Sequence, residues 1–124
     1  MGNENSSYFI DRKQGFIELK PSSPVLGDAV AVTNLMGHCY ADDIDIAIIY
    51  EENLPDHFFD LKSGLAGEIL QKFSTYRFRA VFIISIQRFT GRFAEMAMEE
   101  NKKSRFHFCK NRDAALSFIR NTKT

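Results

Sequence analysis

Hydrophobic residues in this chain of 124 residues fall into short apolar runs that are separated by segments with a different, helical spacing. The run at residues 44–50 is almost continuously apolar and rich in Ile, and residues 80–84 form a second such run. Runs of this length and composition are typical of strands that are covered on both faces of a sheet. Residues 105–109 predict the last strand. Residues 8–10 and 16–19 flank a polar segment that ends in glycine, which predicts a β-hairpin.

Apolar residues spaced every three or four positions predict four helices. Ser23–Pro24 is suited to capping a first helix that ends near Gly37, and residues 60–73 predict the second helix. Residues 91–101 predict a third helix, and Asn111 would cap the last one. The positions expected to be buried are Val25, Ala29, Val32, Leu35 and Met36 in the first helix, Leu61, Leu65, Ile69, Leu70 and Phe73 in the second, Phe93, Met96 and Ala97 in the third, and Ala115, Leu116, Phe118 and Ile119 in the last.

These elements follow one another in the order β-β-α-β-α-β-α-β-α, which predicts a single α/β domain over residues 1–124. Right-handed crossovers between successive strands imply a mixed, mostly parallel sheet, with the N-terminal β-hairpin as its antiparallel edge. Residues 1–7 precede the first apolar run and are expected to be frayed.

The net charge of zero conceals an uneven distribution along the chain. Residues 1–60 carry 11 acidic and 3 basic side chains, whereas residues 61–124 carry 5 acidic and 13 basic ones. Folding would commonly interleave the two halves, so that the charges pair locally or are solvated. The alternative is a dipolar molecule whose basic surface meets an acidic partner, which includes a second copy of the chain.

Cys39 and Cys109 are isolated and lack the spacing of a metal site, and the three histidines are far apart in sequence. Both thiols are therefore expected to be reduced and to lie in the core. No apolar run approaches the roughly 20 residues that a membrane span needs, and no apolar segment of a secretion signal follows Met1. We expect a cytoplasmic protein without a metal, a cofactor or a membrane contact.

Candidate site residues gather where the predicted strands end, because ligands of open α/β sheets bind at the carboxyl ends of the strands. Glu51 and Asn53 directly follow the run at residues 44–50. Ser63 would lie in the first helical turn, where the positive field of the helix N-terminus stabilises a phosphate. Alternatively, its hydroxyl only bonds the first-turn backbone. Small residues in the same helix favour close approach of a strand, a ligand or a partner: Gly64, Ala66 and Gly67.

Residues 58–73 read FFDLKSGLAGEILQKF, and residues 44–119 closely resemble a bacterial family of uncharacterised small proteins with the core FFDL-(K/R)-(S/T)-GLAGEILQKF. That family in turn resembles the STAS fold of anti-sigma-factor antagonists and sulfate-transporter tails. In STAS domains, a D-S-(S/T)-G-L turn follows the central strand and opens a helix, and its second hydroxyl residue is phosphorylated to control partner binding. The segment Asp60–Leu65 is similar to this turn with one extra residue. The resemblance therefore implies a single STAS-like domain in which Ser63 is regulatory, and it places Asn101 near an expected Glu-Ser-Asn.

Three functions compete on this sequence. The first is a non-catalytic regulatory or protein-interaction module, with an unidentified protein partner or a second copy docking at the Ser63 helix. The second is a small-molecule-binding protein or an enzyme that uses an acidic cluster, although no nucleophile motif, phosphate loop or metal signature is present. The third is nucleic-acid binding through Arg/Phe segments, against which the zero net charge and a Phe-rich core argue. The cluster of the second function comprises Glu51, Glu52, Asp60 and Glu68.

Overall fold

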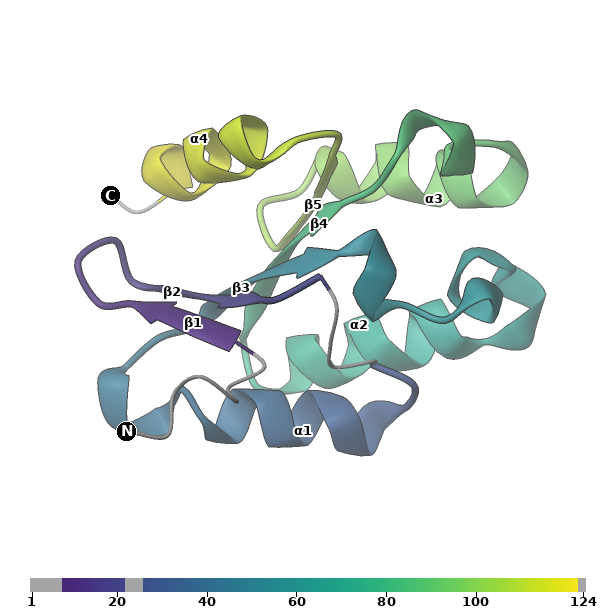
Figure 1. The fold of residues 1–124 in the computed structure, drawn as a ribbon. Coiled ribbons are helices and arrows are strands. Elements are labelled where there is room, and N and C mark those ends of the chain that lie inside the picture. Colours follow the sequence, from purple (N-terminus) through teal and green to yellow (C-terminus); the bar gives the residue numbers. More distant parts are fainter. Residues whose placement is uncertain (1–7, 22–25, 123–124) are drawn as a thin grey trace.

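The computed structural model describes residues 8–21 and 26–122, which form one five-stranded sheet and four α-helices (Figure 1). The strands are β1 (Tyr8–Asp11), β2 (Phe16–Leu19), β3 (Ile46–Tyr50), β4 (Arg79–Ile83) and β5 (Phe106–Cys109). The helices are α1 (Ala29–Gly37), α2 (Leu65–Thr75), α3 (Gly91–Asn101) and α4 (Arg112–Thr122). The expected α/β class is confirmed.

The order of the strands across the sheet is the same as their order along the chain. β1 pairs antiparallel with β2, and each later pair of neighbours is parallel, so the sheet is mixed and β3 is its central strand. Right-handed crossovers that all advance in one direction place the connecting helices on one face of the sheet. Accordingly, α1, α2 and α3 pack on one face, and α4 covers the opposite face (Figure 1).

The central strand shows why its sequence is almost continuously apolar. Ala47 and Ile49 pack into the layer formed with α1, α2 and α3, whereas Ile46 and Ile48 pack into the layer formed with α4. All four side chains are fully buried. A strand that is covered on both faces leaves no position at which a polar residue would contact water.

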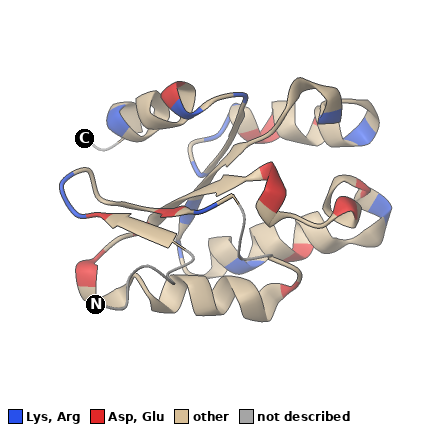
Figure 2. Cartoon of the chain, in the orientation of Figure 1, with Lys and Arg blue, Asp and Glu red and all other residues tan. Residues whose placement is uncertain are grey.

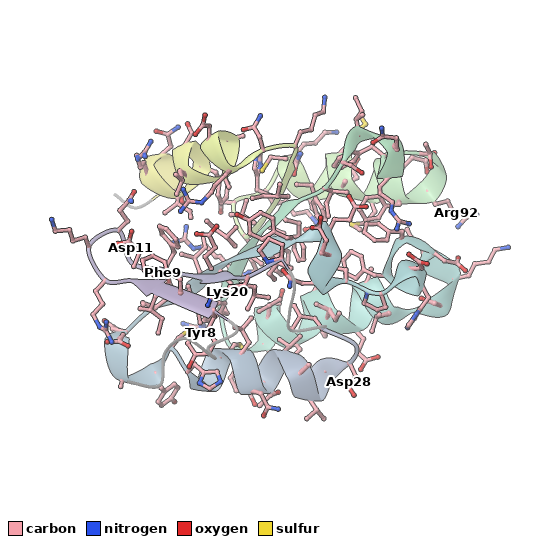
Figure 3. The ribbon with its side chains drawn as sticks, viewed as in Figure 1. Tyr8, Phe9, Asp11, Lys20, Asp28 and Arg92 are labelled. Atoms are coloured by element: carbon pink, nitrogen blue, oxygen red, sulfur yellow. The ribbon has the colours of Figure 1, made fainter. Side chains whose placement is uncertain are left out.

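The first helix begins later than the sequence predicted. Ser23 and Pro24 lie outside the described residues, and α1 starts at Ala29 with Asp28 as its N-cap. The Asp28 carboxylate accepts a hydrogen bond from the Ala31 N–H at 2.9 Å, which is the usual way in which Asp satisfies a first-turn donor. Figure 3 shows Asp28 at this end of α1.

The second helix also begins later than predicted, at Leu65 instead of residue 60. Gly64 has a φ of +82°, a left-handed conformation that side chains rarely adopt, and it separates α2 from the preceding residues. Those residues form two short 3-10 helices, Asp56–Phe59 and Leu61–Ser63. The pattern of apolar positions continues through this segment, which is why the sequence suggested one uninterrupted helix.

The predicted core positions fall into three groups. Val25 lies outside the described residues, and four positions are only half-buried: Ala29, Leu61, Met96 and Phe118. The others are buried: Val32, Leu35, Met36, Leu65, Ile69, Leu70, Phe73, Phe93, Ala97, Ala115, Leu116 and Ile119. Within the described residues, no helix has both the length and the apolar character required to cross a membrane.

The two oppositely charged halves of the chain supply different strands of the sheet, the acidic half one end of the strand order and the basic half the other. Because strand order equals chain order, the acidic half supplies β1, β2, β3 and α1, and the basic half supplies α2, β4, α3, β5 and α4. Asp and Glu mark the turns at both ends of β3, and Lys and Arg mark the ends of α3 and α4 (Figure 2). Ion pairs join the halves: Arg79–Asp45 at 3.6 Å, Arg88–Glu51 at 3.1 Å, Arg88–Asp56 at 2.9 Å and Arg112–Glu18 at 2.8 Å. Among the described residues, these ion pairs are where opposite charges of the two halves meet.

Candidate functional site

The turn that leads into α2 is built by two residues with special backbone roles. The Asp60 carboxylate accepts a hydrogen bond from the Lys62 N–H at 3.1 Å and so caps the 3-10 helix Leu61–Ser63. Gly64 then reverses the backbone with its positive φ, and α2 begins at the next residue. Asp as a cap and Gly in the left-handed region are the residue types that such a turn requires.

Ser63 is exposed and lies immediately before Gly64, not in the first turn of α2 as the sequence predicted. Its hydroxyl donates a hydrogen bond to the His57 carbonyl oxygen at 2.6 Å. The Ser63 Oγ in turn accepts a hydrogen bond from the Leu65 N–H at 3.2 Å. The Oγ is therefore held at the N-terminus of α2, where unpaired N–H groups and the helix dipole favour negative charge.

Glu51 lies just beyond the carboxyl end of β3 and is held by neighbouring elements. One carboxylate oxygen accepts from the Ser85 N–H at 2.8 Å, and the other accepts from Arg88 Nε at 3.1 Å. Arg88 also bonds Asp56 at 2.9 Å and lies over the Phe59 ring, 4.4 Å from its centroid. Burial acts to raise the pKa of Glu51, but these hydrogen bonds outweigh it and lower the pKa. Glu51 is thus suited to joining loops as a carboxylate and not to donating a proton near neutral pH.

Asn53 is fully buried and connects three backbone segments. Its side-chain oxygen accepts from the Tyr50 N–H at 2.8 Å, and its side-chain nitrogen donates to the Lys20 carbonyl at 2.8 Å. Its own carbonyl accepts from the Leu26 N–H at 2.7 Å. These bonds fix the ends of β2 and β3 against the chain that leads to α1, which is a structural role.

Glu68 lies on α2 and is exposed, and its hydrogen-bond partner belongs to α1. Its carboxylate accepts a hydrogen bond from the Ala29 N–H at 3.1 Å, at the N-terminus of α1. Glu52 is exposed on the turn after β3. The acidic residues proposed as one cluster therefore have separate surroundings, because Glu51 joins loops, Asp60 caps a turn and Glu68 caps α1.

Asn101, at the end of α3, binds the backbone of an edge strand at two points. Its side-chain oxygen accepts from the Phe108 N–H at 2.7 Å, and its side-chain nitrogen donates to the Phe108 carbonyl at 3.0 Å. The carbonyls of Arg105 and Cys109 accept hydrogen bonds from the N–H groups of Ala80, in β4, and Ile84, just after it, so the Phe108 groups point to the open side of β5. Asn101 thus occupies positions that another strand would otherwise use.

Sequence reasoning missed one cluster of charged and polar side chains, on the face of the sheet covered by α4. Arg112 donates to both carboxylate oxygens of Glu18 at 2.8 Å, and the Tyr50 hydroxyl donates to the same carboxylate. Burial acts to raise the pKa of Glu18, yet the bonds from Arg112 and Tyr50 lower it overall. Burial together with the Glu18 charge raises the pKa of Tyr50 to about 12. The only sequence signal was an acidic residue inside a predicted strand.

The aromatic residues of the Arg/Phe segments are mostly in the core. Phe78, Phe93 and Phe106 are buried, and Phe89 is half-buried against Phe93. Arg92, at the start of α3, extends away from the body of the domain (Figure 3). Buried rings do not offer faces for base stacking. In the part of the chain that the structure describes, no three His, Cys, Asp or Glu side chains are arranged to hold a metal ion.

Comparison with protein-family models identifies the family of this chain. Residues 11–119 match the model of a domain of unknown function, DUF4180, which covers nearly every strand and helix described above. Neither the curated proteins nor the solved structures contain a match to the chain. The chain therefore belongs to the DUF4180 family, as an α/β domain with a mixed five-stranded sheet.

Proposed function

We propose that this domain is a non-catalytic, STAS-like regulatory module that binds a protein partner and is switched by phosphorylation of Ser63. The observation that carries the proposal is the position of the Ser63 hydroxyl. It is exposed, it immediately precedes the Gly64–Leu65 step, and it lies at the start of the helix that follows the central strand. In STAS domains, which the sequence resembles, the phosphorylated hydroxyl is expected at this place, and this supports the proposal.

The extra residue between Asp60 and Ser63 is compatible with this role. It belongs to the single 3-10 turn Leu61–Ser63 that Asp60 caps, and Ser63 still directly precedes the glycine that opens α2. The insertion therefore lengthens the turn without moving the hydroxyl away from the helix N-terminus.

Phosphorylation at this position would change the surface without requiring the helix to unfold. A phosphate brings about two negative charges at neutral pH and several acceptor oxygens. The Ser63 oxygen already accepts from the Leu65 N–H at 3.2 Å, so the added charge lies where the dipole of α2 stabilises an anion. The hydrogen bond to the His57 carbonyl would be lost, because the oxygen that donates it becomes part of the phosphate ester. The main effect is a new anionic patch that a partner has to tolerate or avoid.

The test uses three immobilised forms of the whole protein as baits: wild type, Ser63→Ala and Ser63→Glu. Lysate from cells that naturally make the protein is passed over each bait, and bound proteins are quantified by mass spectrometry. We expect a stoichiometric partner whose recovery differs at least about tenfold between Ser63→Ala and Ser63→Glu. Thr75→Glu, which adds the same charge at the exposed far end of α2, is the matched control and should behave as wild type. Equal recovery on all baits would refute the switch.

Phosphate on Ser63 itself is tested separately. The protein isolated from the same cells is digested, and the peptide that contains Ser63 is examined by tandem mass spectrometry. A phosphorylated fraction supports the proposal, and its absence under all growth conditions in which the partner is bound and released contradicts it. The acidic-cluster alternative gains no support from the geometry, since its carboxylates have separate surroundings.

A further inference from the structure

A groove of about 480 Å³ runs between α2 and α3 on the face of the sheet that carries three helices. Its apolar lining comes from Leu61, Ala66, Leu70, Met96 and Phe106. Leu70 and Phe106 belong to the core layer beneath, so the bottom of the groove is continuous with the hydrophobic core. A concave surface with an apolar floor is suited to taking up apolar side chains of another molecule.

On the α2 side, the groove is lined by Gly67, a glycine that the backbone conformation does not require. A Cβ atom added to Gly67 would meet nothing within 4 Å, so no neighbouring element packs against this position. Gly67 is helical, whereas Gly64, which also lines the groove, needs its positive φ. Glycine inside a helix is destabilising relative to other residues. Its effect here is to leave open the space that a side chain would fill.

The rim of the groove is basic. Lys103 and Arg105 line one end, with Glu100 as the acidic lining residue, and Lys103 forms an ion pair with Glu100 at 3.6 Å. Lys103 is 64% exposed. At the other end, Leu61 and Gly64 belong to the turn that contains Lys62 and that precedes the positive N-terminus of α2. All residues that line the groove come from the basic half of the chain.

From this geometry we infer that the groove between α2 and α3 binds an acidic, amphipathic segment of a partner protein. The apolar side chains of the bound segment lie on Leu70, Met96 and Phe106, and the carboxylates of the segment face Lys103 and Arg105. This inference rests on the proposed function and names the chemistry of the partner. Charge complementarity selects the acidic segment, because an apolar floor with a basic rim favours acidic over basic sequences.

The same arrangement gives the Ser63 switch a direction. Ser63 directly precedes Gly64, which lines the groove, so a phosphate on Ser63 adds negative charge at one end of it. An acidic segment is repelled by that charge. Phosphorylation therefore releases the partner.

The test begins with random peptides of about 16 residues displayed on phage and selected on the wild-type protein. We expect the enriched peptides to be net acidic, with apolar residues at helical spacing. The affinity of a synthetic enriched peptide, measured by fluorescence anisotropy, should fall at least about fivefold between about 50 and about 300 mM NaCl. Enriched peptides that are neutral or basic, or a selection that yields no binder, would overturn the inference.

Gly67→Gln fills the groove in a variant that is expected to fold. Because the added side chain meets open space, its thermal unfolding midpoint should equal or exceed that of wild type. The enriched peptide should nevertheless bind it at least about tenfold more weakly. The matched control is Gly37→Gln, at an exposed glycine of α1 where an added Cβ also meets nothing within 4 Å, and its affinity should be unchanged. If Gly67→Gln binds the peptide as tightly as wild type does, the inference that the peptide lies in this groove is wrong.

Two further comparisons separate the groove from the switch. If Gly67→Gln weakens binding and Ser63→Glu does not, the result supports binding in the groove and contradicts its control by Ser63. If Ser63→Glu weakens binding and Gly67→Gln does not, the segment binds elsewhere and the groove fails. Sedimentation of the wild type and Gly67→Gln tests for a second copy as the occupant, and a dimer that only Gly67→Gln disrupts would contradict a separate partner.

Discussion

The contact between Asn101 and β5 supports the sharpest prediction about stability. Asn101→Ala removes two hydrogen bonds, of 2.7 and 3.0 Å, from the backbone of Phe108, a residue that is buried. A buried backbone group left without a partner costs about 1–3 kcal/mol. Because Asn101 itself is exposed, water reaches part of the vacated space, and we expect a total loss of about 1–3 kcal/mol in the free energy of unfolding.

The measurement is urea unfolding of wild type and Asn101→Ala, followed by circular dichroism. For a domain of this size, each kcal/mol lost from the free energy of unfolding corresponds to a decrease of about 3–6 °C in the thermal midpoint. Size-exclusion chromatography adds a second readout, because the freed edge of β5 should promote concentration-dependent association. Asn34→Ala, at an exposed position of α1, is the control and should change the free energy of unfolding by less than about 0.5 kcal/mol. A difference of less than about 0.5 kcal/mol for Asn101→Ala would refute the reasoning.

Three further predictions concern ionisable groups that are buried or half-buried. Arg112→Ala leaves the Glu18 carboxylate without its two-point partner and should lower the free energy of unfolding by about 1–3 kcal/mol near pH 7. The pKa of Glu18 is lower in the folded than in the unfolded state, so this stabilisation is present above the unfolded pKa and is lost as the pH falls toward the folded pKa. The difference in the free energy of unfolding between wild type and Arg112→Ala, measured by urea titration, should therefore become smaller at acid pH. Burial lowers the pKa of His107, which stacks on Phe118 at 4.5 Å, so stability should decline as the pH falls below about 6.5. His107→Phe should reduce that decline in thermal scans, and an unchanged pH profile would argue against the assignment. Burial raises the pKa of Cys39 to about 12 and that of Cys109 to about 11, so both thiols should react with a thiol reagent at pH 8 only as fast as the protein opens, and rapid labelling of the folded protein would contradict this.

The regular elements of the fold were predictable from the sequence because their signal is periodic. The fully buried run of β3 and the helical spacing of α2 and α4 each extend over several residues and report burial directly. Asn111 was also predicted as a cap, and its side chain accepts from the Ala114 N–H at 2.8 Å. Such local caps involve residues three apart in sequence, so the sequence contains the information.

The candidate site was only partly predictable because its contacts are not local. Glu68 bonds the backbone of Ala29, 39 residues away, and Glu18 bonds Arg112, 94 residues away. Neither pairing produces a periodic pattern. The short 3-10 helix before α2 was missed for a different reason, since a single turn set by Asp60 and Gly64 is too short to show a period of its own.

The position of the charges shows how topology decides what a sequence pattern means. A linear separation of acidic and basic residues has no fixed consequence, because many α/β folds place distant segments side by side. Here the strands follow one another across the sheet in chain order, so the separation persists in space. The basic rim of the groove between α2 and α3 is a direct result.

The most direct test of the proposed function compares the domain with and without phosphoserine at position 63. Phosphoserine is incorporated genetically in place of Ser63, and a second protein carries it in place of Thr75, at the other end of α2. The dissociation constant of the partner recovered on the Ser63→Ala bait is then measured for each form by calorimetry. Phosphoserine at position 63 is predicted to weaken binding at least about tenfold, whereas position 75 should leave it unchanged. Equal affinity of the unmodified and position-63 forms would contradict Ser63 as the switch.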